Sequence, residues 1–173
     1  MTNRADGDTM DEGSTGIYTK TKPEEVVRRI REHPFFAGFP ERFLPTLAGC
    51  AMPVEFHAGQ SIFNVGDLAN RFYLIESGRI RLQAEGPEGQ MVTLQTIGPG
   101  QVLGWSWLFP PHYWRFSAEA LDPVGAVFLY GTRLRELGEA DPAFGYALMK
   151  RVAQIVIDRL QDARARLLQL PPS

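Results

Sequence analysis

The stretch that most constrains the fold is residues 51–130, where apolar residues recur at a spacing of about two. This period is typical of β-strands, whose side chains alternate between two faces. Glycines divide the stretch into short segments at Gly59, Gly66, Gly78, Gly86, Gly89, Gly98 and Gly100. Short strands with turn residues at such regular intervals predict an antiparallel sandwich, barrel or jelly roll rather than alternating strands and helices.

A helical pattern precedes these strands. Pro23 suits a first helical position, Glu24 complements the helix dipole, and the pattern ends near His33. A second short helix is expected around Glu41–Leu47. Residues 1–20 are polar and contain almost nothing to bury, so they are expected to form a disordered tail.

The chain is helical again after Gly131. A short helix is broken at Pro142, and the helix that follows is long. Its apolar residues recur at alternating spacings of three and four: Tyr146, Met149, Ala153, Val156, Leu160, Ala163, Leu167 and Leu170. Such a heptad seam is typical of a coiled coil and predicts a homodimer through residues 146–170. The alternative is a plain surface helix with one stripe as wide as its core contact.

A second apolar stripe on this helix, formed by Leu148, Val152 and Ile155, covers only its first half and is expected to pack on the β-domain. The charged residues alternate in sign, which indicates a solvated, salt-bridged face and only weakly suggests nucleic acid: Lys150, Arg151, Asp158, Arg159, Asp162, Arg164 and Arg166. These patterns predict one mainly β domain over 21–173, with N-terminal helices over 21–50, a β-roll over 51–130 and C-terminal helices over 131–170.

Composition narrows the classes of protein that the chain can belong to. The 173 residues carry 18 basic and 20 acidic side chains, so no global charge favours nucleic acid or a basic partner. The single cysteine, Cys50, excludes an internal disulfide and fits a reducing cytoplasm. No signal-peptide core and no apolar run of about 18 residues is present, so we expect a cytoplasmic protein that does not enter a membrane.

The sequence contains no pattern of catalytic or metal-binding residues. The three histidines, at positions 33, 57 and 112, are scattered and lack zinc spacing. Neither a phosphate-binding Walker loop nor a nucleophile elbow occurs. Ser106 and His112 are close in sequence, but no orienting carboxylate accompanies them. We therefore expect a protein that is not an enzyme, binds no metal and requires no cofactor.

The candidate ligand-binding loop covers residues 98–118. Its glycines, among them Gly104, allow positive φ and close approach of a ligand. The segment from Trp105 to Phe109 is expected to form one short helical turn, which the two prolines that follow would end. The N-terminus of a helix favours binding of a phosphate or carboxylate, and the planar guanidinium of Arg115 could donate two hydrogen bonds to such a group. The alternative is a strand connection whose aromatic residues lie in the core.

Three segments resemble the cyclic-nucleotide-binding domain of the catabolite activator protein superfamily, and the resemblance covers about residues 33–168. HAGQSIFNVGD is similar to the family's opening strand-turn-strand, and FYLIESGRIRL to its next hairpin, with Gly78 at the turn. IGPGQVLGWSWLFPPHYWRFSA is similar to its phosphate-binding cassette. The resemblance implies a jelly-roll-like β-roll with flanking helices, a long dimerisation helix, and cyclic AMP, cyclic GMP or another small anion as ligand.

The cassette departs from the family pattern at one position. The family's glutamate, which accepts hydrogen bonds from the ribose hydroxyl, falls on Trp105, whose indole offers only a donor. Arg115 matches the phosphate-binding arginine, and Ser117 replaces a usual small residue after it. The resemblance implies these ligand-binding residues: Gly104, Trp105, Ser106, Trp107, Arg115, Ser117 and, on the dimer helix, Tyr146.

Two functions follow from this resemblance. The first is a stand-alone regulatory module without a DNA-binding helix-turn-helix domain, which binds a cyclic nucleotide or another small anion and signals to a protein partner through its dimer helix. The second is a degenerate β-roll that binds no ligand and acts as a dimeric interaction scaffold, its pocket collapsed around Trp105, Trp107 and Trp114.

Overall fold

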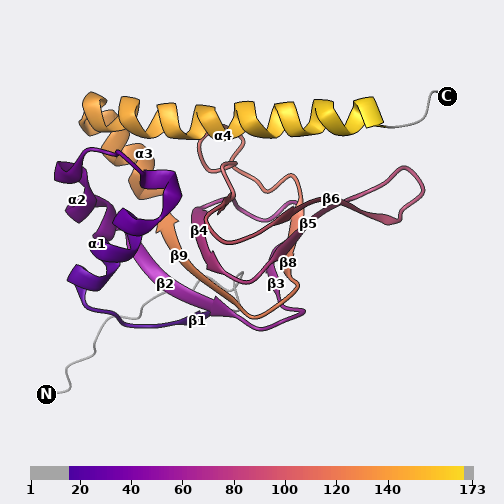
Figure 1. The fold of residues 1–173 in the computed structure, drawn as a ribbon, viewed down its shortest axis with the longest axis horizontal. Helices are drawn as coiled ribbons and strands as arrows, with labels where there is room; N and C mark the ends of the chain where they lie inside the picture. Colours follow the sequence, from indigo (N-terminus) through magenta and orange to yellow (C-terminus); the bar gives the residue numbers. More distant parts are fainter. Residues whose placement is uncertain (1–15, 170–173) are drawn as a thin grey trace, which may run out of the picture.

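The computed structural model describes residues 16–169, which form two antiparallel sheets with helices at one end and one long helix across them (Figure 1). The five-stranded sheet has the order β1 (Ile17–Tyr18), β2 (Ala51–Phe56), β9 (Val124–Tyr130), β4 (Arg71–Ser77) and β7 (Val102–Leu103). The four-stranded sheet has the order β3 (Ser61–Phe63), β8 (Ser117–Ala120), β5 (Ile80–Glu85) and β6 (Met91–Ile97). Every strand pair is antiparallel, which confirms the predicted β-roll class.

The N-terminal helices are present where the sequence predicts them. They are α1 (Pro23–Glu32), the 3-10 turns η1 (Pro34–Phe36) and η2 (Glu41–Phe43), and α2 (Leu44–Ala48). The predicted second helix therefore begins as a 3-10 turn. The predicted disordered tail is wrong at its end, because β1 pairs with β2 and places Ile17 opposite Glu55. Residues 1–15 of that tail lie outside the described residues.

Two hydrophobic cores lie on opposite faces of the five-stranded sheet. Alternation along β4 sends Phe72 and Leu74 into one core, with the N-terminal helices, and Tyr73 and Ile75 into the other, between the sheets. Strand β9, which pairs with β4, divides its side chains in the same way. Both strands are apolar along most of their length because both of their faces are buried.

Helices α3 (Gly131–Ala140) and α4 (Pro142–Gln169) follow the last strand. Asp141 caps α4, since its carboxylate accepts hydrogen bonds from the amides of Ala143 and Phe144 at 2.9 and 3.2 Å. No helix within residues 16–169 has the length and apolarity needed to cross a bilayer.

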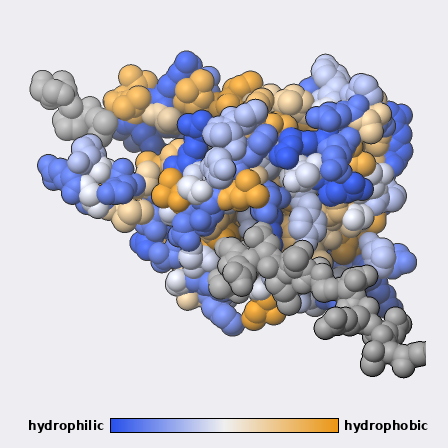
Figure 2. All heavy atoms as spheres, turned by 180° about the vertical axis from the view of Figure 1, so that it is seen from behind, coloured by the Kyte–Doolittle hydropathy of each residue, from blue (hydrophilic) through white to orange (hydrophobic). Residues whose placement is uncertain are grey.

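The two stripes of α4 have different environments. Leu148 and Val152 are buried and Ile155 packs against the same core, which confirms the expectation for the second stripe. The heptad-seam residues up to Leu167 are exposed, and Leu170 lies outside the described residues. In Figure 2 hydrophobic residues gather along the upper edge of the molecule, where α4 runs. The helix thus joins the domain through one face and leaves an apolar face open.

Candidate functional site: the cassette loop and the helix that covers it

The cassette loop connects β7 to β8, and Gly104 allows it to turn tightly. Gly104 has a φ of 84°, and a Cβ there would lie 2.6 Å from the Trp114 ring. Glycine is therefore required both for the backbone conformation and for the close approach of the indole. The short turn predicted after Gly104 is present but is not helical: one hydrogen bond, from the Leu108 amide to the Trp105 carbonyl at 3.0 Å, closes it. The two prolines that follow have no N–H to extend it.

Aromatic side chains of the chain fill the cassette. Trp114 stacks on Phe63 with ring centroids 3.9 Å apart and an interplanar angle of 11°. Backbone hydrogen bonds fix Trp114, because its amide donates to Asp67 and its carbonyl accepts from Gly66. The space that remains beside Gly104 and Trp105 is about 30 Å³. That is room for about one water molecule, whereas pockets for small organic ligands measure roughly 300–1,000 Å³.

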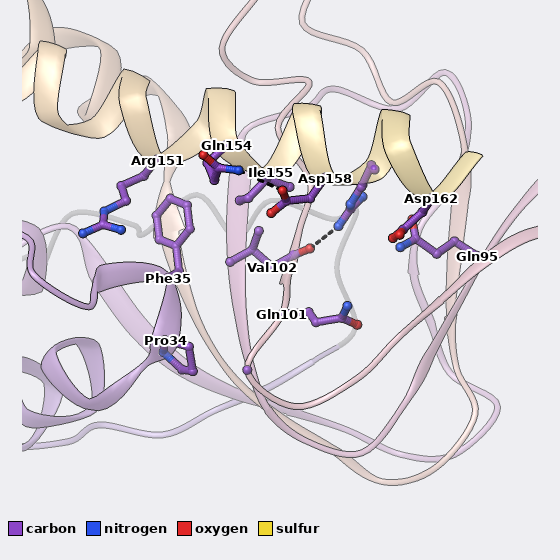
Figure 3. Close-up of a pocket in the computed structure, with 12 residues that line it drawn as sticks. Pro34, Phe35, Gln95, Gln101, Val102, Arg151, Gln154, Ile155, Asp158 and Asp162 are labelled. Carbon is purple, nitrogen blue, oxygen red and sulfur yellow. Dashed lines mark hydrogen bonds between the residues drawn. The ribbon is translucent and has the colours of Figure 1, made fainter. Parts of the chain in front are cut away.

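Helix α4 closes the cassette through Arg159. The Arg159 guanidinium lies over the Trp105 ring at 4.2 Å and donates a hydrogen bond of 2.6 Å to the Val102 carbonyl, drawn in Figure 3. Burial lowers the pKa of Arg159 to about 10, against a smaller opposing effect of Asp162. The side chain is still a cation at neutral pH, so the indole face and the carbonyl stabilise a charge that α4 has taken out of water.

A second cavity of about 280 Å³ lies on the other side of Arg159. It is bounded by α4, η1 and the turn between β6 and β7, and Gln95, Gln101, Asp158 and Asp162 supply polar groups to its wall (Figure 3). Arg159 lines both cavities. Its side chain therefore separates the cassette from the larger space beneath α4.

Sequence reasoning missed the role of Arg159, which it assigned to a solvated, salt-bridged face. The structure shows a half-buried guanidinium, and no carboxylate within residues 16–169 forms an ion pair with it. A signal was available in the sequence. Arg159 follows Ile155 by four residues and so continues the stripe that packs on the domain.

The structure brings together four of the seven predicted ligand-binding residues. Gly104, Trp105, Ser106 and Arg115 line the small cassette cavity. Arg115 is exposed, and nothing in the described part of the chain hydrogen-bonds or pairs with its guanidinium. Among the described residues there is also no group of three side chains that could hold a metal ion.

The other three predicted residues lie away from the cassette cavity, contrary to expectation. The Ser117 hydroxyl accepts a hydrogen bond from the Val65 amide at 3.0 Å. Trp107 is fully buried, with its ring 5.9 Å from that of Phe72, because the single turn directs it into the core. Tyr146 is 67% exposed near the start of α4, and only the later half of that helix, at Arg159, covers the cassette.

Comparison with known proteins identifies the family. The family model named "Cyclic nucleotide-binding domain" matches residues 53–141, just over half of the chain. The chain belongs to the cyclic nucleotide-binding domain family. That family has a regulatory, ligand-binding role rather than a catalytic one.

Curated relatives and solved structures agree with this membership. The "CRP-like cAMP-activated global transcriptional regulator" of Mycobacterium tuberculosis is 27% identical over 119 residues, which are 69% of this chain and 53% of that protein. This chain spans about half the length of such curated relatives.

Two solved structures share the fold over most of this chain. A protein of Geobacter metallireducens GS-15 that is named for cyclic nucleotide binding is 30% identical, with a TM-score of 0.69 over 82% of this chain and 99% of that one. The Thermus thermophilus Catabolite Activator Protein is 26% identical, with a TM-score of 0.63 over 78% and 61%. The resemblance stated from the sequence and the predicted fold class are thereby confirmed.

Proposed function

We propose that this cyclic nucleotide-binding domain protein is a cytoplasmic regulatory module that binds no cyclic nucleotide in its cassette and acts as a dimeric interaction scaffold. One observation carries the proposal: the cassette cavity measures about 30 Å³. A cyclic nucleotide needs roughly ten times that space. The function therefore lies in the surface of the domain, and above all in the exposed seam of α4.

The contact between Trp105 and Arg159 supports a closed state that needs no ligand. In the family pattern the position of Trp105 carries a glutamate that accepts hydrogen bonds from a ribose. An indole face instead attracts a cation, and Arg159 of α4 provides it. Two side chains of the protein therefore link the cassette to α4 without a ligand. In such a module the arrangement of α4 is fixed without a nucleotide.

A second candidate function, sensing of a small anion, is favoured by Arg115. Its guanidinium stands at the family's phosphate-binding position, is exposed, and has no ion-pair partner among residues 16–169. Gly104 and Ser106 line the same cavity. An anion held there would have to displace Arg159 from Trp105 to gain space. It could then act as a switch only by binding the open arrangement more tightly than the closed one.

Thermal unfolding against cyclic AMP, cyclic GMP, phosphate and sulfate tests both candidates. A ligand at 100 times its Kd stabilises the folded state by about 2.7 kcal/mol, which for a domain of this size raises Tm by about 5–10 °C. The proposed scaffold predicts no saturable shift with either nucleotide. A saturable shift with one of the anions that Arg115→Ala abolishes would support the sensor instead.

A further inference from the structure

A cavity lies between α3 and α4, away from the cassette cavity. Its volume is about 480 Å³, within the range of small-molecule sites. Its walls are mainly apolar and include Leu108, Leu134, Leu148 and Met149. Trp107 and Tyr146, two predicted ligand-binding residues that lie away from the cassette, both line this cavity.

Two residues that line this cavity each carry a donor without an acceptor or a counterion. The Trp107 indole nitrogen Nε1 is buried and has no hydrogen-bond partner within the described residues. Leaving such a donor unpaired costs about 1–3 kcal/mol, so native proteins seldom do so. Arg135 donates to the Trp107 carbonyl, and no carboxylate among residues 16–169 pairs with its guanidinium.

The cavity wall carries one cation and one exposed carboxylate, and a further cation lies nearby. Arg135 lines the wall, and Lys150 adds a second positive charge close by, with its ammonium 4.6 Å from the centre of the Tyr146 ring. Glu139, which is exposed, is the carboxylate that lines the cavity and opposes them. Apolar walls with one guanidinium that no carboxylate within residues 16–169 pairs with suit a molecule with an apolar body and a single carboxylate.

We propose that the α3–α4 cavity binds an amphipathic monocarboxylate, with its apolar body against Leu134 and Met149 and its carboxylate on Arg135. Trp107 belongs to the cassette loop, and Tyr146 and Met149 belong to the dimer seam. The proposal is independent of whether the cassette binds a ligand.

The test uses decanoate as probe and the indole N–H resonances of the three tryptophans as reporter. Titration of ¹⁵N-labelled protein should shift the Trp107 resonance saturably, while those of Trp105 and Trp114 stay in place. Trp107→Phe serves only to assign that resonance. Decanol, which has the apolar chain without the carboxylate, should bind at least about tenfold more weakly, the loss expected for one charge-assisted hydrogen bond.

Two arginines of α3 provide a matched pair of variants. Arg135→Gln should weaken decanoate binding by about tenfold or more. Arg133→Gln, which removes an exposed residue paired with Glu136 outside the cavity, should leave it unchanged. Equal effects of the two variants, or a Trp107 resonance that decanoate does not move, would overturn the proposal.

Discussion

At the scale of single residues, Trp105 and Arg159 close the cassette on the side of α4. Each alone is a poor fit to its surroundings: Trp105 stands where the family places a carboxylate, and Arg159 holds a charge in a half-buried position. Together they satisfy each other, because the guanidinium lies on the indole face and donates to the Val102 carbonyl. The pair therefore explains both the departure from the family pattern and the closed pocket.

Replacing Arg159 by alanine should destabilise the protein by about 1–2 kcal/mol, because one cation–π contact and one charge-assisted hydrogen bond are lost. Urea unfolding measures the change, and hydrogen exchange should show faster opening in the later half of α4. Arg164→Ala is the control, since Arg164 is exposed on the same helix and forms no hydrogen bond or ion pair within residues 16–169. Equal stabilities of the two variants would show that Arg159 does not hold α4 on the cassette.

His33 should make stability depend on pH. Its Nδ1 accepts from the Phe35 amide at 3.3 Å, so Nε2 carries the proton and donates to the Ile75 carbonyl at 3.1 Å. Burial lowers its pKa below the ordinary value of 6.5. Below about pH 6.5 the unfolded chain takes up a proton that the folded chain resists, so stability falls as the pH drops through that value.

Urea midpoints at about pH 7.5 and about pH 5.5 measure this effect. His33→Gln retains a donor and an acceptor but cannot titrate, so its midpoint should fall less than that of the wild type. His57→Gln is the control, because His57 is exposed beside a turn. A wild type and a His33→Gln variant that lose the same stability between the two pH values would exclude the histidine as the source.

At the scale of elements, α4 has one face that packs on the domain and another that is exposed and apolar. Its first half is anchored by Phe144, Leu148 and Val152, which are buried in the core. Its seam presents large exposed apolar side chains, including Val156 at 43%, Leu160 at 48% and Leu167 at 67%. A row of apolar residues on an anchored helix supports the proposed homodimer, since burial of each side chain stabilises association by roughly 1.5–3 kcal/mol.

Leu160→Glu should convert the proposed dimer into a monomer, because two carboxylates would meet at the centre of the seam. Sedimentation equilibrium measures the mass directly. Gln161→Glu introduces the same charge one residue away from the seam and should leave the dimer intact. A wild type that sediments as a monomer at all concentrations would contradict the proposed dimer, and so would a dimer that Leu160→Glu does not weaken.

The elements could be predicted from the sequence because the spacing of apolar residues and the positions of turn residues depend on the local backbone conformation. The predicted strands at residues 71–77 and 124–130 and the double stripe of α4 all appear in the structure. The segment after Gly104 was predicted as one short helical turn and forms a single hydrogen-bonded turn, because a tryptophan-rich pentapeptide gives no signal that distinguishes the two. Strand β1 was missed because two residues, Ile17 and Tyr18, are too few to show a period.

At the scale of the whole molecule, the fold followed from the sequence and the state of the pocket did not. The glycines and the hairpin identified the β-roll, and Trp105 indicated a changed cassette. What fills the cassette depends on contacts between distant segments. Phe63 and Trp114 are about fifty residues apart, and Trp105 meets a helix residue more than fifty positions later. No local pattern encodes such contacts.

The measurement that tests the central claim most directly is a calorimetric titration of the wild-type protein with cyclic AMP, beside Trp105→Glu. The account predicts no binding to the wild type, because Trp105, Trp114 and Arg159 leave only about 30 Å³. It predicts measurable binding to Trp105→Glu, which restores the ribose acceptor of the family pattern and removes the indole under Arg159. Saturable binding of cyclic AMP to the wild type, abolished by Arg115→Ala, would contradict it.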